Sequence, residues 1–432
     1  MRKAFPSPMG GSRRRKDDAL VAALDIGASK IVCFIARLVP ESDGGTHAEI
    51  IGVGCHGVGG APTAAPSAHD IEIGVRNAVD AAERMARARI QRVCVAAPGG
   101  FLRARRIGVD LEVADGFVTE EDVDDSLDEG AAIASPEDCA TLHALPIEFK
   151  VDGAEIMNDP VGLSGAVLST EMLGVGLRQS MVDNLSALVE RCGLKTDAFI
   201  AAPFAAAEAT LLEDEKDLGV VLIDIGAAST SYAIYDNGAL IDVGGVPVGG
   251  GHITKDIAQI FGTPFAHAER VKTLQGAALI GPGDEHRFVD FPQLGVAGET
   301  ARASRAEVCE VIIPRMEEIF ELVAKQWPED GFQRIGLRRA VITGGGSLLV
   351  GAREIAERAL SMKARLGRPA LFAGAPEAAS APGFAVSAGL VQHYANLGAE
   401  PKSGLGIPRQ SRHAGKSGAL FGGMEAWLRA KF

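Results

Sequence analysis

The chain has 432 residues, of which 47% are hydrophobic and 23% charged, and its formal net charge is −13. A chain of this length and composition is expected to form two or more globular domains around a large core. The acidic balance argues against a nucleic-acid-binding protein, and six cysteines without C-x-x-C spacing argue against disulfides and a zinc site.

At the N-terminus, residues 1–16 are rich in Gly, Pro, Ser and Arg and predict a mobile basic tail. Asp25 interrupts the apolar stretch that follows, which argues against a secretion signal, and no apolar run is long enough to predict a membrane-spanning helix.

A short motif ends two apolar runs that lie about 200 residues apart, roughly one domain length. In the first string, LVAALDIGASK, the apolar run ends at Asp25 and a turn follows at Gly27. In the second string, VVLIDIGAAST, the apolar run ends at Asp224 and a turn follows at Gly226. Each turn is followed by another β-rich run, so the order differs from the strand, glycine loop and helix of dinucleotide and P-loop sites. The repeat predicts two related lobes.

The segment between the two motifs, about residues 100–179, has an α+β pattern of its own. Strands are predicted in VCVAAPGGFLRARRIGVDLEV, and a helix is predicted from Thr119, with Asp122 in the capping position. Helical spacing is also clear in GVRNAVDAAERMARARI, MVDNLSALVERCG and RAEVCEVIIPRMEEIFELVAKQW. In the C-terminal half, Asp236–Gly238 predicts a hairpin turn. Further on, RRAVITGGGSLLVGAREIAERAL predicts a strand, a turn through Gly344–Gly346 and a helix.

These three glycine turns predict a site for a nucleotide. Facing hairpins present backbone N–H groups to a polyphosphate, because small residues let the backbone approach closely. Phosphate oxygens repel the carboxylates of Asp25 and Asp224, so the expected partner of both is Mg²⁺, held through its water ligands. The third turn, with a helix N-terminus close by, would carry the nucleoside.

At these motifs the sequence resembles the ATPase superfamily of actin, Hsp70 and the sugar kinases. ALDIGASK and LIDIGAAST are similar to its two phosphate motifs, and VITGGGSLL is similar to its adenosine motif. Further strings resemble the FtsA family of bacterial cell-division proteins, in order, over residues 19–395; they are NDPVGLSG, ERCGLK, DIAQIFGTPFAHAERVK and VIIPRMEEI.

The resemblance implies an α/β, two-lobed actin-like ATPase fold with an inserted α+β subdomain in the first lobe and a C-terminal amphipathic helix. It also implies ATP and Mg²⁺ between the lobes, and self-association into filaments. The expected division of the chain is a first-lobe core at 17–99 and 180–215, the inserted subdomain at 100–179, a second-lobe core at 216–262 and 335–397, and an outer subdomain of the second lobe at 263–334.

The resemblance also implies which residues bind the nucleotide. From the first lobe these are Asp25, Gly27, Ser29 and Lys30. From the second lobe they are Asp224, Gly226, Ser229, Glu269, Lys272, Gly344, Gly345 and Gly346. Asp25 and Asp224 would hold the metal through water. From the sequence alone, Glu269 and Lys272 could equally form an ordinary surface ion pair one helical turn apart.

Two departures from the pattern affect the expected chemistry. Where many relatives have glycines in the second phosphate turn, this chain has Ala227 and Ala228, whose methyl groups would crowd the phosphates. Several superfamily ATPases place an acidic residue before the proline of the connecting helix to position the attacking water, and here that residue is Ala202. Glu208 lies too far along the helix to replace it. We therefore expect ATP binding with slow or absent hydrolysis, and no catalytic residue is nominated.

The resemblance implies three kinds of partner besides a second copy of the chain. The outer subdomain would receive the C-terminal peptide of the tubulin-like division protein FtsZ, which usually carries acidic and apolar residues. Arg302, Arg305 and Glu310 are the candidate contacts, although a solvated helix face explains them equally well. Later division proteins would dock on the inserted subdomain. The third partner is the inner surface of the cytoplasmic membrane at the division site.

The membrane contact is expected at the C-terminus. Residues 398–420 are rich in Gly, Ser and Pro and predict a flexible linker, and residues 421–432 predict a short amphipathic helix. A helix of this length covers about 15 Å and can lie on a bilayer without crossing it. From residue 398 onward there are six Lys or Arg and two Glu, which favours anionic lipids. The expected membrane residues are Phe421, Met424, Trp427, Leu428, Arg429, Lys431 and Phe432.

Other members of the superfamily remain as alternatives. A pilus-assembly-type actin-like adaptor would share the inserted subdomain but is not expected to have the amphipathic C-terminus. A sugar kinase or polyphosphatase would need a catalytic base between the lobes, and the sequence offers no motif for one. A chaperone of the Hsp70 type would need a substrate domain after the ATPase, and too few residues follow residue 397 to form one.

Overall fold

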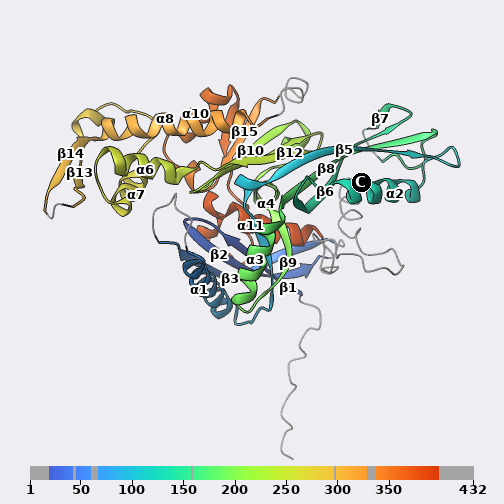
Figure 1. The fold of residues 1–432 in the computed structure, drawn as a ribbon, viewed down its shortest axis with the longest axis horizontal. Helices are drawn as coiled ribbons and strands as arrows, with labels where there is room; N and C mark the ends of the chain where they lie inside the picture. Colours follow the sequence, from blue (N-terminus) through green and yellow to red (C-terminus); the bar gives the residue numbers. More distant parts are fainter. Residues whose placement is uncertain are drawn as a thin grey trace, which may run out of the picture.

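The computed structural model describes residues 19–41, 45–59, 67–156, 159–295, 298–327 and 337–397, and contains two lobes (Figure 1). Each lobe has a five-stranded sheet, with the order β3-β2-β1-β4-β9 in the first and β12-β11-β10-β15-β16 in the second. In both sheets an antiparallel meander of three strands is extended by two parallel strands. This shared order confirms the two related lobes predicted from the repeated motif.

The bounds of the strands follow the predicted apolar runs. The first-lobe sheet consists of β1 (Ala19–Ile26), β2 (Lys30–Pro40), β3 (Thr46–Gly57), β4 (Arg92–Ala97) and β9 (Lys195–Ala201). The second-lobe sheet consists of β10 (Val220–Ile225), β11 (Thr230–Asp236), β12 (Ala239–Val246), β15 (Arg339–Thr343) and β16 (Lys363–Leu366). The turn between β11 and β12 is the predicted one, with Asn237 and Gly238 both at positive φ.

Two helices lie between the sheets and join the lobes (Figure 1). These are α4 (Ala202–Thr210), which contacts strands of both sheets, and α11 (Ala385–Asn396), which packs on α4 and on β1. Their backbones approach so closely that a Cβ atom at Gly389 would overlap the carbonyl oxygen of Ala205. On the other side, α1 (Ala68–Ala86) covers β2 and β3, and α3 (Gln179–Arg191) packs beside it.

The second lobe carries further helices and a small hairpin. The helix α8 (Arg305–Ala324) has an apolar face, which includes Phe320 and is buried in the core of this lobe. Its first turn is capped by Ser304 and Glu307. The other elements of this lobe are α5 (Glu213–Asp217), α6 (Gly250–Ile260), α7 (Phe265–Leu274), α10 (Ala352–Leu360), β13 (Phe288–Pro292) and β14 (Thr300–Ser304). The described residues of the whole chain also form five short 3-10 helices: η1 (Gly99–Phe101), η2 (Asp284–His286), η3 (Gly345–Leu348), η4 (Glu377–Ser380) and η5 (Pro382–Phe384).

A separate four-stranded sheet interrupts the first lobe after β4, as the α+β pattern predicts. Its strand order is β5-β8-β6-β7, and α2 (Glu120–Ile133) packs on one face through a small core that includes Leu127 and Met172. The predicted capping of α2 by Thr119 and Asp122 is confirmed. The strands are β5 (Arg103–Glu112), β6 (Cys139–Val151), β7 (Ala154–Ile156) and β8 (Val167–Arg178).

Among the described residues, no helix combines the length and the apolar character that crossing a membrane requires.

A buried histidine attaches the inserted sheet to the helices between the lobes. His143 of β6 accepts a hydrogen bond at Nε2 from the backbone N–H of Ala201 (3.0 Å) and packs on Phe204, which in turn contacts His393. Burial, with a smaller effect of the neighbouring His393, lowers the pKa of His143 to about 3. Burial also lowers the pKa of His393, although Glu208 opposes this effect.

We expect His143 to make the fold acid-sensitive. Because its folded-state pKa lies below the unfolded value of about 6.5, its contribution is complete above that value and is lost as the pH falls toward 3. Between pH 7.5 and pH 5 the wild type should therefore lose about 2 kcal/mol more unfolding free energy than His143→Gln, which keeps an acceptor for Ala201 but does not titrate. Urea unfolding at both pH values measures the difference, and equal losses in the two proteins would contradict the assignment.

Candidate functional site

The two predicted hairpin turns have the same backbone geometry. In the turn between β1 and β2 the N–H of Gly27 donates to the carbonyl oxygen of Lys30 (3.0 Å), and between β10 and β11 the N–H of Gly226 donates to that of Ser229 (3.0 Å). A Cβ atom on either glycine would lie within 2.9 Å of the accepting oxygen, so a larger residue would open the turn. Both turns therefore need glycine at the residue that follows the strand end.

The aspartates that precede these turns lie close to each other across the two lobes. Burial raises the pKa of Asp25 to about 6, while Lys30 opposes the rise. Burial raises the pKa of Asp224 to about 7, and repulsion by the charge of Asp25 adds to the effect. Two carboxylates that repel each other in a partly closed space favour a cation between them. Oxygen ligands of this kind suit Mg²⁺ and its waters, so the donor set fits the expected metal.

Lys30 of the first lobe reaches the third glycine turn. Its Nζ lies 4.0 Å from the centre of the Phe384 ring, and a Cβ atom at Gly383 would lie 2.6 Å from Nζ and 3.8 Å from Cα of Gly345. Burial lowers the pKa of Lys30, whereas the charges of Asp25 and Asp224 oppose the change. The positive charge of Lys30 in turn opposes the rise in the pKa of both aspartates.

The third turn packs directly against the second. Asp224 lies opposite Thr343 in the parallel pair β10–β15, and Gly344 (φ +83°) has no room for a side chain, because a Cβ atom there would overlap Oδ1 of Asp224. The predicted helix does not follow the turn directly. The chain first forms η3, then passes through Gly351 (φ +87°), and only then begins α10. This left-handed residue redirects the chain, which separates the helix N-terminus from the glycine turn.

Lys272 has more partners than a surface ion pair would give it. Its Nζ pairs with Glu269 (2.7 Å) and also donates to the carbonyl oxygen of Gly250 (2.9 Å) and to Thr254 Oγ1 (2.8 Å), and its side chain is only 13% exposed. A Cβ atom at Gly250 would lie 3.7 Å from Cα of Gly346. The structure therefore brings the Lys272 head group to the junction of the second and third turns.

Sequence reasoning missed two glycine-rich segments at this site. At the start of α6, the N–H groups of Gly250 and Gly251 donate to Gly226 O (2.9 Å) and Ala227 O (2.8 Å), and these hydrogen bonds hold the second turn against α6. The second segment, in η1, places Gly100 against Ser229. The strings PVGGGHIT and APGGF are the signals that could have identified them, since each ends a β-rich run with consecutive glycines.

The residues expected to limit hydrolysis lie at the start of the connecting helix. Ala202 is the first residue of α4 and is buried. The carboxylate of Glu208, further along, pairs with Lys216 (3.1 Å) and accepts a hydrogen bond from Asn396 (2.9 Å). Both of its oxygens are thus engaged in the scaffold. Within the described parts of the chain, no group of three or more His, Cys, Asp or Glu side chains is arranged to hold a metal.

The candidate peptide contacts lie at the far end of the second lobe and differ in exposure. Arg302 of β14 is 66% exposed, stacks 4.6 Å from the Phe288 ring and lies 3.7 Å from Asp290. Arg305 begins α8 and is 19% exposed, because its guanidinium group pairs with the buried Asp284. Glu310 is exposed on α8. The expected membrane residues of 421–432 lie outside the described residues.

Comparisons with known proteins agree with this geometry. The profile of a family described as "Cell division protein FtsA" matches residues 221–389, and one described as "SHS2 domain inserted in FTSA" matches residues 99–175. The cell division protein FtsA of Agrobacterium fabrum is 34% identical over 385 residues, which cover 87% of each chain. That of Escherichia coli K12 is 30% identical over 426 residues, or 96% of this chain and 99% of the relative.

The chain belongs to the FtsA family of cell division proteins. The resemblance to the FtsA family inferred from NDPVGLSG and the accompanying strings is therefore confirmed, and the inserted β5–β8 sheet corresponds to the segment that the inserted-domain profile of FtsA matches. A profile described as "Type IV pilus assembly protein PilM" also matches residues 153–278. The chain of a PilM–PilN type IV pilus biogenesis complex has the same fold, with a TM-score of 0.58 at 18% identity, over 89% of this chain and 99% of that one. The two-lobed actin-like fold with an inserted subdomain is thus established for this FtsA-family member.

Proposed function

We propose that this FtsA-family protein binds ATP and Mg²⁺ between its lobes, polymerises at the cytoplasmic face of the membrane and tethers the FtsZ ring to it at the division site. Later division proteins would dock on the inserted subdomain. One observation carries the proposal: the two aspartates and the three glycine turns, which are far apart in the sequence, converge at one place between the lobes. Asp224 lies against Gly344 of the third turn, and the charge of Asp25 in the first turn raises the pKa of Asp224.

In this proposal the nucleotide acts as a switching ligand rather than as a rapidly consumed substrate. Asp25 and Asp224 would hold Mg²⁺ through water, and the metal would neutralise phosphate charge. The turns at Gly27 and Gly226 would face the phosphates, while Glu269, Lys272 and Gly344–Gly346 would face the nucleoside. Turnover would be slow or absent, because Ala202 has no carboxylate to position water and Glu208 is held by Lys216. ATP would then shift the population between lobe arrangements.

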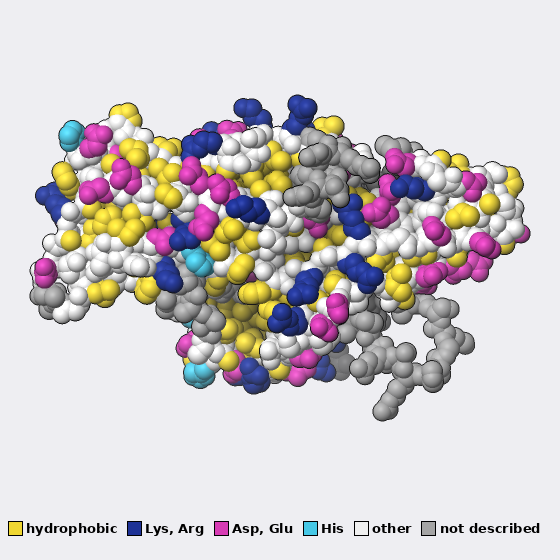
Figure 2. Space-filling model, turned by 45° about the horizontal axis from the view of Figure 1, so that its top comes forward, with side chains coloured by type: hydrophobic (Ala, Val, Ile, Leu, Met, Phe, Trp, Pro, Cys, Tyr) yellow, Lys and Arg dark blue, Asp and Glu magenta, His cyan; other side chains and the backbone are white. Residues whose placement is uncertain are grey.

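The hairpin β13–β14 is the proposed docking surface for the FtsZ peptide. Figure 2 shows hydrophobic side chains gathered at the end of the molecule where Figure 1 places these strands. Phe288 is 54% exposed, and the exposed Leu294 lies just beyond β13. Arg302 and Arg287 add exposed positive charge beside Phe288. Apolar surface next to basic groups suits a peptide with acidic and apolar residues.

Reversing the charge of Arg302 is expected to weaken binding of the FtsZ C-terminal peptide by roughly tenfold or more, since a rim arginine facing an acidic peptide becomes a repelling carboxylate. Fluorescence anisotropy with the labelled peptide measures the affinity of Arg302→Glu. Arg353→Glu is the matched control, because Arg353 is a similarly exposed second-lobe arginine with an acidic neighbour. Arg305→Glu is a poor test, because it would face the buried Asp284 and disturb the fold. Unchanged affinity in Arg302→Glu would remove this residue from the site.

The C-terminal segment is expected to bind anionic membranes, with the apolar residues of 421–432 in the interface and the basic residues at the headgroups. A single short helix binds weakly, so polymerisation would strengthen attachment through avidity. Flotation with anionic liposomes should carry the full chain upward and leave behind both Trp427→Glu and a truncation after residue 420. Liposomes without anionic lipid are the control. Equal flotation of all three proteins would contradict the anchor.

A pilus-assembly-type adaptor is the second candidate, because the PilM profile matches residues 153–278. Such a protein would share the fold but would not require the FtsZ peptide or the C-terminal membrane segment. The peptide and flotation measurements therefore separate the two functions. A sugar kinase or polyphosphatase is less well supported, since neither the sequence nor the described site offers a catalytic base for a second substrate.

A further inference from the structure

The first turn of the inserted subdomain lies against the second phosphate turn. After β4 the chain enters η1 through Pro98, and a Cβ atom at Gly100 would lie 2.6 Å from Cβ of Ser229 and 3.3 Å from Val246 O. At Gly99, a Cβ atom would lie 2.5 Å from Oγ of Ser231 and would also touch the start of α4. The inserted segment therefore begins in contact with the hairpin that carries Ser229, which belongs to the other lobe.

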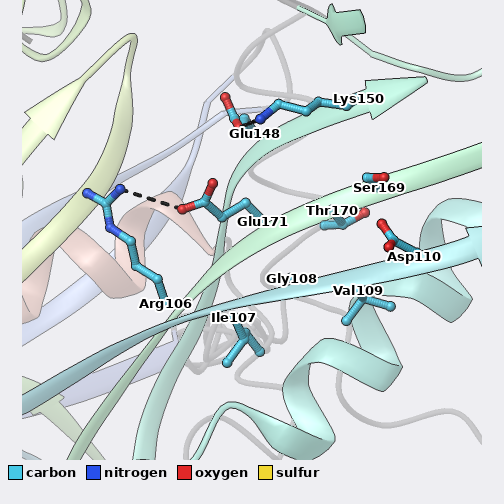
Figure 3. A pocket seen from close by; sticks show the side chains of 10 residues that line it. All are labelled: Arg106, Ile107, Gly108, Val109, Asp110, Glu148, Lys150, Ser169, Thr170 and Glu171. Atoms are coloured by element: carbon cyan, nitrogen blue, oxygen red, sulfur yellow. Dashed lines mark ion pairs between the residues drawn. The ribbon is translucent and has the colours of Figure 1, made fainter. Parts of the chain in front are cut away.

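A second contact between the insertion and the second lobe occurs a few residues later. Nε of Arg106 in β5 donates to the carbonyl oxygen of Ile241 (3.2 Å) in β12, the edge strand of the second-lobe sheet. Its guanidinium group also lies 3.5 Å from Glu171 of β8. Figure 3 shows this pair in a polar hollow on the inserted sheet, where Glu148 and Lys150 form another ion pair. The insertion is thus covalently continuous with the first lobe, and it contacts the second lobe through η1 and Arg106.

We propose that the contact of Gly99 and Gly100 with Ser229 and Ser231 positions the second phosphate turn, so that occupancy of the phosphate site and the state of the inserted subdomain are coupled through this contact. The inference rests on the proposed nucleotide function and adds the route by which the nucleotide reaches the insertion. Ser229 lies against η1, so a shift of Ser229 toward η1 would displace the residues that lead into β5. Coupling of this kind acts equally in both directions.

The geometry gives each glycine variant a distinct expectation. In Gly100→Ala the added methyl group pushes Ser229 out of place, so MgATP affinity should fall by about fivefold or more, the range of a coupling between two sites. In Gly108→Ala the methyl group enters open space in β5 of the same subdomain, with nothing within 4 Å, so affinity should be unchanged. A purely structural role for Gly100 would lower the melting temperature without changing affinity well below it.

Hydrogen–deuterium exchange of the full chain with and without MgATP tests the coupling, alongside calorimetric titration of MgATP. In the wild type and in Gly108→Ala, MgATP should slow exchange in peptides that cover residues 99–112, and in Gly100→Ala this protection should shrink with the affinity. Unchanged exchange at 99–112 in a wild type that binds MgATP would overturn the inference even if Gly100→Ala failed to fold, and so would wild-type affinity in Gly100→Ala. No MgATP binding by the wild type would instead overturn the proposed nucleotide function, and this inference with it.

Discussion

Replacing both Asp25 and Asp224 with asparagine is expected to weaken Mg²⁺-dependent ATP binding strongly and, at the same time, to stabilise the nucleotide-free protein. Burial raises the pKa of Asp25 to about 6, and burial together with repulsion by Asp25 raises the pKa of Asp224 to about 7. Because both folded-state pKa values lie above the unfolded value, ionisation at neutral pH costs stability, and the cost disappears as the pH falls below about 4. Neutral amides remove this cost, but they also remove the charge that would attract the metal.

Two measurements with opposite expected signs make the double variant a strict test. Thermal unfolding without nucleotide at pH 7.5 should show a gain of about 1 to 3 kcal/mol. Calorimetric titration with MgATP should show affinity reduced by about 100-fold or more, as when charged contacts to a metal–phosphate group are lost. The matched control is Asp110→Asn with Asp115→Asn, two exposed aspartates of the insertion. A double variant that binds MgATP like the wild type would exclude the aspartates from the site.

Replacing Gly389 with alanine is expected to destabilise the protein by about 2 to 3 kcal/mol, although the same change in an exposed helix would stabilise it by about 1 kcal/mol. The added Cβ atom would overlap the carbonyl oxygen of Ala205 and lie 3.0 Å from its Cα, so α4 and α11 would have to move apart. These helices join the lobes and are surrounded by fully buried residues, so the strain cannot be relieved by a single side chain.

Chemical denaturation of Gly389→Ala and of Gly57→Ala separates this packing effect from the general effect of the substitution. Gly57 ends β3, and a Cβ atom there would have no neighbour within 4 Å. Gly57→Ala should therefore change the unfolding free energy by less than about 0.5 kcal/mol. Equal stability of wild type and Gly389→Ala would contradict the close contact between α4 and α11.

The sequence was sufficient for features that depend on local pattern. The runs that end at Asp25 and Asp224 are apolar, β-rich and followed by glycine, and these properties predicted both hairpins and the relation between the lobes. The capping of α2 by Thr119 and the turn at Asn237 follow from residue preferences over a few positions. Predictions of this type need no knowledge of distant contacts.

Features that depend on tertiary contacts could not be read from the sequence. Gly99 and Gly250 act through residues of other segments, and although consecutive glycines mark both strings, the sequence does not show which distant residues they contact. Arg302 and Arg305 looked equivalent as candidate peptide contacts, but only the structure shows that Arg305 is paired with the buried Asp284. The separation of α10 from the third turn likewise depends on the left-handed conformation of Gly351, which the string GGGSLLVG does not specify.

A crystal structure of the full chain with Mg²⁺ and a non-hydrolysable ATP analogue tests the central claim most directly. We expect phosphates between the turns at Gly27 and Gly226, a metal whose waters contact Asp25 and Asp224, and a nucleoside between Lys272 and Gly345. A nucleotide bound elsewhere, or a cleft that remains empty at saturating ligand, would contradict it.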